Sequence, residues 1–142
     1  MATRQEIEAE AAKPLAWFQH DTDAANDMKL EQVIDEFGMV GYGRWWRLCE
    51  MLAAETGHRL EVGNERVARI MARRLKCSVS DMMKFVIFLH DVELVTMNGD
   101  GFISNERMNR QAERTGTNRA NGRRGGRPKR RAEETQTAQT GS

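Results

Sequence analysis

The 142-residue sequence predicts a mainly helical α+β fold that carries a basic C-terminal extension. Apolar residues recur at helical spacing in successive segments between residues 23 and 91. Two β-prone runs then flank Asn98-Gly99-Asp100-Gly101, which has the composition of a hairpin turn. The charge is divided, because residues 107–131 hold ten Lys and Arg against one acid, whereas residues 1–106 hold 12 bases and 18 acids. Periodicity and turn chemistry thus predict the fold, and the charge marks a separate basic arm.

The N-terminal part is expected to contain a flexible leader followed by a helix. Residues 1–14 are polar, and Pro14 closes a segment that would form at most a short, loose helix. Asp23 can cap the next helix, since acids are favoured at the positive end of the helix dipole. Gly38 is placed to end this helix in a left-handed conformation. The apolar face is formed by Leu30, Val33, Ile34 and Phe37.

Three further helices and a short strand are expected between residues 42 and 91. The second helix runs from about Tyr42 to Thr56, and residues 58–62 alternate as a strand does. Asn64 can cap the third helix, and Ser78 with Asp81 forms a capping box for the fourth. The inward-facing residues of the three helices are Trp45, Leu48, Cys49 and Leu52, then Val67, Ile70, Met71 and Leu75, then Met82, Phe85, Val86 and Leu89.

The order of these elements predicts a specific topology. A hairpin is expected over residues 92–104 and a last helix over roughly 106–114. Without the first and last helices, the order is helix, strand, helix, helix and hairpin, which is the connectivity of a winged helix-turn-helix. The predicted domain spans residues 15–115 and includes an extra N-terminal helix. Residues 116–142 form a basic tail that is expected to be disordered, because its only apolar side chains are alanines.

The segment WFQHDTDAANDMKLEQVIDEFGMVGYGRWWRLCEML resembles the N-terminal domain of phage replisome organisers, the Lin1244/Lin1753-like group. The resemblance lies in Phe18, His20-Asp21, Asp27, Lys29-Leu30 and the turn from Gly38 to Gly43. Downstream, GFISNERM is similar to the aromatic-x-Ser-x-x-Arg segment of that group. The similarity covers about residues 15–108. It implies a winged-helix module that helps to start replication of phage or prophage DNA, with a helicase or helicase loader as a partner.

Two groups of cations are candidates for nucleic-acid binding. The tail interrupts its cations with glycine and proline, and an AT-hook geometry is one interpretation of Gly126-Arg127-Pro128. The third helix carries arginines at spacings of three and four, which are either phosphate contacts or an ordinary solvated face that Glu61 and Glu65 help to neutralise. The candidates are Arg66, Arg69, Arg73 and Arg74 on the helix, and Arg119, Arg123, Arg124, Arg127, Lys129, Arg130 and Arg131 in the arm.

The fourth helix is poorly suited to read DNA bases, because Lys84 and His90 are its only cations. Met83, Ile87 and Phe88 lie outside its inner stripe, and apolar residues on more than one face indicate burial on two sides. We interpret these three residues as a self-association or partner surface. The alternative is that the first or the last helix covers them within the monomer.

The remaining motifs do not point to catalysis or to a membrane. His20, Asp21, Asp23 and Asp27 could be read as metal ligands, but three of them crowd one helix start, where capping accounts for acids. No cofactor is expected, Cys49 and Cys77 are expected to be reduced, and a cytoplasmic location is expected because no apolar run approaches the length of a membrane span. We therefore expect a DNA-binding protein of phage type, with RNA binding left open. The alternatives are a transcriptional regulator, a non-DNA adaptor that binds a host protein, and a metal nuclease that uses His20 and Asp21.

Overall fold

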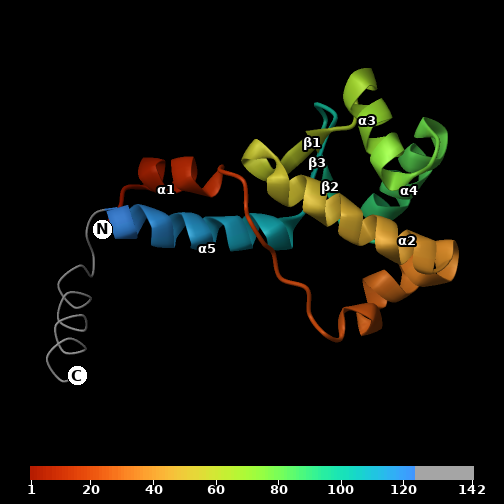
Figure 1. Cartoon of the computed structure of the whole chain (residues 1–142), viewed down its shortest axis with the longest axis horizontal. Coiled ribbons are helices and arrows are strands. Elements are labelled where there is room, and N and C mark those ends of the chain that lie inside the picture. Colours follow the sequence, from red (N-terminus) through yellow and green to blue (C-terminus); the bar gives the residue numbers. More distant parts are fainter. Residues whose placement is uncertain (124–142) are drawn as a thin grey trace, which may run out of the picture. The chain divides into compact units, whose positions relative to one another are not determined.

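The computed structural model describes residues 1–123 and divides them into two compact units. The larger unit is Lys13–Gln111, and the smaller one combines Met1–Ala12 with the described residues 112–123. Within the described part of the chain, no helix is long and apolar enough to cross a membrane. The structure is mainly helical with a small antiparallel sheet (Figure 1).

The larger unit contains the helices and strands in the order that the sequence predicts. They are α2 (Met28–Ala54), β1 (Arg59–Glu61), α3 (Glu65–Leu75), α4 (Val79–Asp91), β2 (Thr96–Met97), β3 (Phe102–Ser104) and the start of α5 (Glu106–Arg123). Single turns of 3-10 helix precede β1 and α2, at Thr56–His58 and Ala24–Asn26. Asn64 caps α3 with its side chain, as predicted. Ser78 caps α4 by accepting from the Asp81 N–H at 3.0 Å, which is one of the two hydrogen bonds of the predicted capping box.

Helix α2 begins at Met28 and not after Asp23. The Asp27 carboxylate accepts hydrogen bonds from the backbone N–H groups of Lys29 and Leu30, at 3.1 and 3.3 Å, so Asp27 is the N-cap. Asp23 precedes the 3-10 turn and makes no capping hydrogen bond. The predicted left-handed glycine is present, since Gly38 has φ 71° and ψ −167°. The sequence predicts that one helix ends at Gly38 and that the next begins at about Tyr42. In the structure the helix continues directly after Gly38, so Gly38 forms a bend within α2 (Figure 1).

The sheet has the strand order β1-β3-β2, and both pairings are antiparallel. Ile103 of the central strand lies opposite Leu60 on one side and Met97 on the other, and it is fully buried. The Asn98 side chain accepts from the Phe102 N–H at 3.1 Å and closes the hairpin loop. At the same end of the sheet, the Gly63 N–H donates to the Gly101 carbonyl of the hairpin loop at 3.1 Å, and this contact fixes the segment that leads into α3.

The hydrophobic core lies between α2, α3, α4 and the sheet. The largest fully buried side chains include Leu48 and Leu52 from α2, Met71 from α3, and Met82, Phe85 and Leu89 from α4. These residues belong to the predicted inner stripes, whereas Val67 and Ile70 are only half-buried. The thiol of Cys49 is buried, which raises its pKa, and neither Cys49 nor Cys77 forms a disulfide.

The smaller unit corrects two expectations about the ends of the chain. Residues 1–14 were expected to be a flexible leader, but Arg4–Ala11 forms helix α1, with a capping box between Thr3 and Glu6. The last helix was expected to end near residue 114, and residues 116–123 to be disordered, but α5 continues to Arg123. Small residues at Ala112, Gly116 and Ala120 are buried and allow the backbones of the two helices to approach.

A close helix contact explains why α1 is ordered. A Cβ atom at Gly116 would lie 2.6 Å from the backbone nitrogen of Ala11, so only glycine permits this approach. Glu10 of α1 is buried, and its carboxylate accepts a hydrogen bond from Arg123 at 2.7 Å. Arg4 forms a second ion pair, with Glu113. The sequence did not predict the stability of α1 or the extension of α5 to Arg123, because both depend on contacts between residues far apart in the sequence.

Substitution of Gly38 by alanine tests the bend. The backbone at Gly38 lies in a region that residues with a Cβ atom rarely adopt, so Gly38→Ala should destabilise the protein by about 1–3 kcal/mol in urea unfolding. Gly43→Ala is the matched control, because Gly43 lies within the same helix with open space around it. The control should be neutral or more stable, since alanine is favoured over glycine in a helix. Equal effects of the two substitutions would contradict the strained bend.

Candidate nucleic-acid interface

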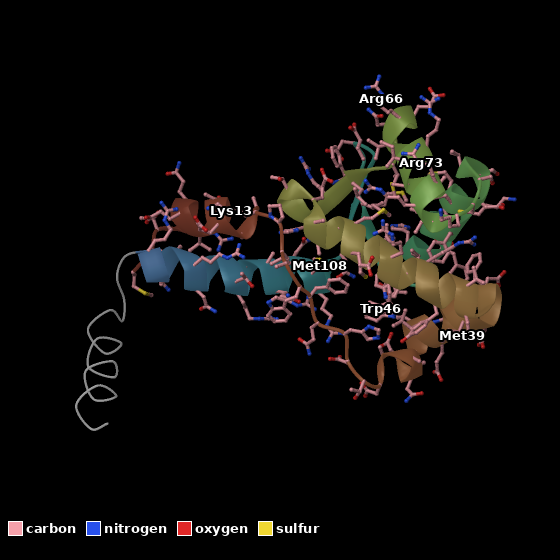
Figure 2. The ribbon with its side chains drawn as sticks, viewed as in Figure 1. Lys13, Met39, Trp46, Arg66, Arg73 and Met108 are labelled. Carbon is pink, nitrogen blue, oxygen red and sulfur yellow. The ribbon has the colours of Figure 1, made fainter. Side chains whose placement is uncertain are left out.

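Helix α3 presents an arginine-rich face to solvent. The Asn64 side chain accepts from the N–H groups of Arg66 and Val67, at 3.0 and 3.1 Å, and so fixes the start of the helix. Ala68, Met71, Ala72 and Leu75 are buried, and this leaves the opposite side of the helix exposed. The four predicted arginines lie on that exposed side: Arg66, Arg69, Arg73 and Arg74. Figure 2 shows Arg66 at the N-terminal end of the helix and Arg73 further along it.

The charges of this face are largely uncompensated. Arg69 lies 3.5 Å from Glu65, but both side chains are well exposed and such a pair contributes little. Within residues 1–123, the side chains of Arg66, Arg73 and Arg74 have no acidic partner. Glu61, which the sequence offered as a second neutralising acid, makes no ion pair with them. Three of the four arginines can therefore meet a polyanion without first breaking an internal salt bridge, and Arg69 would give up only an exposed one.

Arg44 holds the C-terminal end of α3, which the sequence did not predict. Its guanidinium donates to the carbonyl groups of Leu75 and Lys76, at 2.7 and 3.0 Å. Cations near a helix C-terminus satisfy carbonyl groups that lack partners within the helix. The signal in the sequence is the pair of cations that flank two tryptophans in Arg44-Trp45-Trp46-Arg47, which composition alone does not assign to a contact. Arg44 therefore positions α3, and its donor groups are engaged within the chain.

The three residues of the predicted partner surface on α4 differ in their exposure to solvent. Phe88 is half-buried, and its ring meets Phe37 of α2 edge-on at 5.2 Å, so the first predicted helix covers it in part. Met83 is also half-buried, whereas Ile87 is 50% exposed. The exposed polar residues of α4 include Asp81, Lys84 and Asp91, so this face carries no excess of positive charge.

The arm residues fall into two groups. Arg119 is exposed on α5, and Arg123 forms the ion pair with Glu10 described above. Arg123 is thus engaged in the smaller unit. The other five predicted contacts lie outside the described residues: Arg124, Arg127, Lys129, Arg130 and Arg131.

An aromatic cluster joins the N-terminal segment to α2 in the larger unit. His20 stacks on Trp46 with ring centroids 3.5 Å apart and an interplanar angle of 11°. Phe18 also stacks on Trp46, at 6.0 Å, and Tyr42 meets the Trp46 ring edge-on. Trp46 lies between the N-terminal segment and the bend of α2 in Figure 2. The residues of two sequence motifs, the His-Asp pair and the GYG turn, are therefore brought together by packing.

A salt bridge connects the same segment to α5. Arg107 donates to the Asp21 carboxylate at 2.6 Å, and the Gln19 side chain donates to it at 2.7 Å. These hydrogen bonds, that of Arg107 above all, hold the pKa of Asp21 below its ordinary value. Gln111 completes the junction, because its side-chain amide accepts from the Gln19 N–H and donates to the Trp17 carbonyl.

A cleft of about 700 Å³ opens beside this junction, with Phe18, Lys29, Trp46 and Arg107 among its lining residues. Within the lining of the cleft, the Lys29 ammonium group donates to the Glu93 carbonyl at 3.2 Å. His20 and Asp21, which a nuclease would need as metal ligands, are engaged by Trp46 and Arg107. In the part of the chain that the structure describes, no three His, Cys, Asp or Glu side chains are grouped as metal ligands are.

Comparison with known proteins gives one family. The family model described as Lin1244/Lin1753-like, N-terminal, matches residues 17–105, which is more than half of the chain. No curated protein and no solved structure gives a match. The matched range includes α2, α3, α4 and the sheet, together with the aromatic cluster.

The Asp21–Arg107 salt bridge should stabilise the fold in a pH-dependent way. The pKa of Asp21 is lower in the folded protein than in the unfolded chain, where it is about 3.9. The carboxylate therefore stabilises the fold above that pH, and its contribution is lost as the pH falls through the folded value. Asp21→Asn should lower the melting temperature at pH 7, and its effect should become steadily smaller as the pH is lowered below about 3.9.

A double-mutant cycle with Arg107→Gln separates the pair from its surroundings. At pH 7, either substitution alone should remove most of the coupling, and the second should then cost little. Strictly additive losses at pH 7 would show that the two side chains do not stabilise the fold through each other.

Proposed function

The chain belongs to the Lin1244/Lin1753-like N-terminal family, and we propose that it is a DNA-binding winged-helix protein of phage or prophage type that acts in the initiation of DNA replication. The proposal rests chiefly on one observation, the exposed and uncompensated arginine face of α3. It places the protein in the cytoplasm of a host cell, where DNA is accessible.

The topology supports the winged-helix interpretation. The order α2, β1, α3, α4, β2 and β3, with the sheet order β1-β3-β2, has the connectivity of a winged helix-turn-helix. In this assignment the β2–β3 hairpin is the wing, and α4 occupies the place of the recognition helix. The tip of the hairpin carries Asp100 and no cation, so the proposal gives the wing no phosphate contact.

The charge distribution favours contact with the DNA backbone over the reading of bases. The exposed face of α4 offers Lys84 against Asp81 and Asp91, which is unsuited to the major groove. Helix α3, by contrast, exposes cations along one side, because Arg66, Arg69 and Arg73 are spaced by three and four residues. Contacts between arginine and phosphate position a protein on DNA without specifying sequence. We therefore propose binding with low sequence preference.

The basic arm adds affinity in this proposal. A chain segment dense in arginine and lysine releases counterions when it contacts a nucleic acid, and its binding weakens as salt rises. This contribution does not distinguish DNA from RNA. Competition between duplex DNA, single-stranded DNA and RNA of equal length would measure which polymer the protein prefers.

The role in replication rests on the family resemblance, which also implies a helicase or helicase loader as a partner. A sharp preference for one operator sequence would instead favour a transcriptional regulator. No binding to any nucleic acid at low salt would favour an adaptor that binds a host protein.

Substitution on α3 tests the proposed phosphate contacts. Arg66→Gln/Arg73→Gln should weaken duplex binding to a similar extent on unrelated sequences. It should also reduce the slope of log affinity against log salt by about 2, since each phosphate contact contributes about 0.9. Arg47→Gln is the matched control, because Arg47 lies on α2 and pairs with Glu50 at 3.1 Å. An unchanged slope in the α3 variant would exclude this helix from the interface.

Truncation tests the arm without disturbing α5. A chain that ends at Arg123 keeps every described element and loses five cations, so its duplex affinity at low salt should fall by roughly tenfold or more, with a smaller salt slope. A chain that ends at Ala132 keeps those cations and should bind as the full chain does. Equal affinities for all three chains would rule out an electrostatic role for the arm.

A further inference from the structure

We propose that the bend of α2 is the interface through which two copies of this chain associate. The bend surface consists of Phe37, Met39 and Val40 from α2 and of Ile87 and Phe88 from α4. All five residues belong to the larger unit. The inference does not depend on DNA binding, and it extends to α2 the self-association that the sequence indicated for α4 alone.

The bend surface includes large apolar side chains that are well exposed. The backbone of Gly38 breaks α2, and the next two side chains, Met39 and Val40, are 65% and 62% exposed. Figure 2 shows Met39 at the outer side of the bend. Exposed apolar side chains that are gathered on one surface are typical of protein–protein contacts.

This surface is continuous with the hydrophobic core. Phe37 lies directly before the bend, and its ring meets both the buried Phe85 and the half-buried Phe88, each at 5.2 Å. Ile87, which is 50% exposed, follows the Phe85-Val86 pair on the same helix. The aromatic contacts hold α2 and α4 together at Phe37, so the two segments that carry the bend surface are fixed relative to each other.

Charges of opposite sign flank the bend. Asp35 and Glu36 are exposed just before it. On the other side, Arg44 lies four residues beyond Val40 and binds the C-terminal end of α3, which carries exposed Arg74 and Lys76. In the described part of the chain, none of these four flanking side chains, Asp35, Glu36, Arg74 and Lys76, forms an ion pair.

This arrangement fits a second copy of the same chain. In a two-fold symmetric interface, each patch of one copy meets the matching patch of the other, so residue i contacts j and j contacts i. A two-fold axis between the flanks would place Met39 and Val40 of the two copies in contact. The same operation sets the acidic flank of each copy against the basic flank of the other, so that both charge contacts are attractive.

The expected dimer is weak. The bend surface has five apolar side chains, whereas a standard stable interface uses roughly 20–30 residues and about 800 Å² per partner. A dissociation constant on the order of tens of micromolar is therefore expected. At about 3.6 residues per turn, Arg74 is rotated about the axis of α3 away from Arg66, Arg69 and Arg73. Those three arginines would therefore stay free for phosphate contact in the dimer.

Sedimentation of the full chain without DNA, over a concentration series that brackets this value, tests the interface. Met39→Glu/Val40→Glu should remain monomeric throughout the series, because it places four like charges at the symmetry axis. Met28→Glu is the matched control, since Met28 is 76% exposed on the same helix but lies at its start. It should dimerise as the wild type does. A wild-type chain that stays monomeric, or a dimer unaffected by the double substitution, would overturn the proposal.

Charge reversal provides a test that a structural defect cannot imitate. Asp35→Lys/Glu36→Lys and Arg74→Glu/Lys76→Glu should each be monomeric alone, because both contacts of the symmetric pair become repulsive. When the two variants are mixed, both contacts become attractive again, so a heterodimer should form. Failure of the mixture to associate would show that the flanks do not meet, whatever the outcome of DNA-binding experiments.

Discussion

The bend at Gly38 is the constraint on which the larger unit depends. A backbone conformation that only glycine adopts easily divides α2 into two segments with different tasks. The first segment holds Phe37 against α4, and the second places Arg44 against the end of α3 and Trp46 against the N-terminal segment. The same bend leaves Met39 and Val40 in solvent, so one glycine determines both the packing and an apolar surface.

Arginines in this protein serve two different purposes. Arg4, Arg44, Arg107 and Arg123 bind carboxylates or carbonyl groups and connect helices or segments within a unit. Arg66, Arg73 and Arg74 instead extend from a helix whose other face is buried, with no acidic partner among the described residues. The number of basic residues in the sequence does not distinguish paired arginines from unpaired ones. The structure separates arginines that hold segments of the fold together from those that are exposed without an acidic partner among the described residues.

Local features of the fold could be predicted, whereas features that depend on distant contacts could not. Asn64, Ser78 and Gly38 were identified because a cap or a left-handed glycine acts within a few residues. Helix α1 and the end of α5 were missed because Glu10, Gly116 and Arg123 are far apart in the sequence and stabilise each other only when folded. For the site, the arginines of α3 followed from helical spacing. The Asp21–Arg107 pair and the role of Arg44 required the tertiary structure.

Amide chemical-shift mapping during a titration with duplex DNA is the most direct test of the central claim, that α3 is the DNA-binding face. The largest changes are expected along Glu65–Leu75, with small changes on the exposed side of α4. Changes confined to Val79–Asp91, or no change in the larger unit at a saturating DNA concentration, would contradict it.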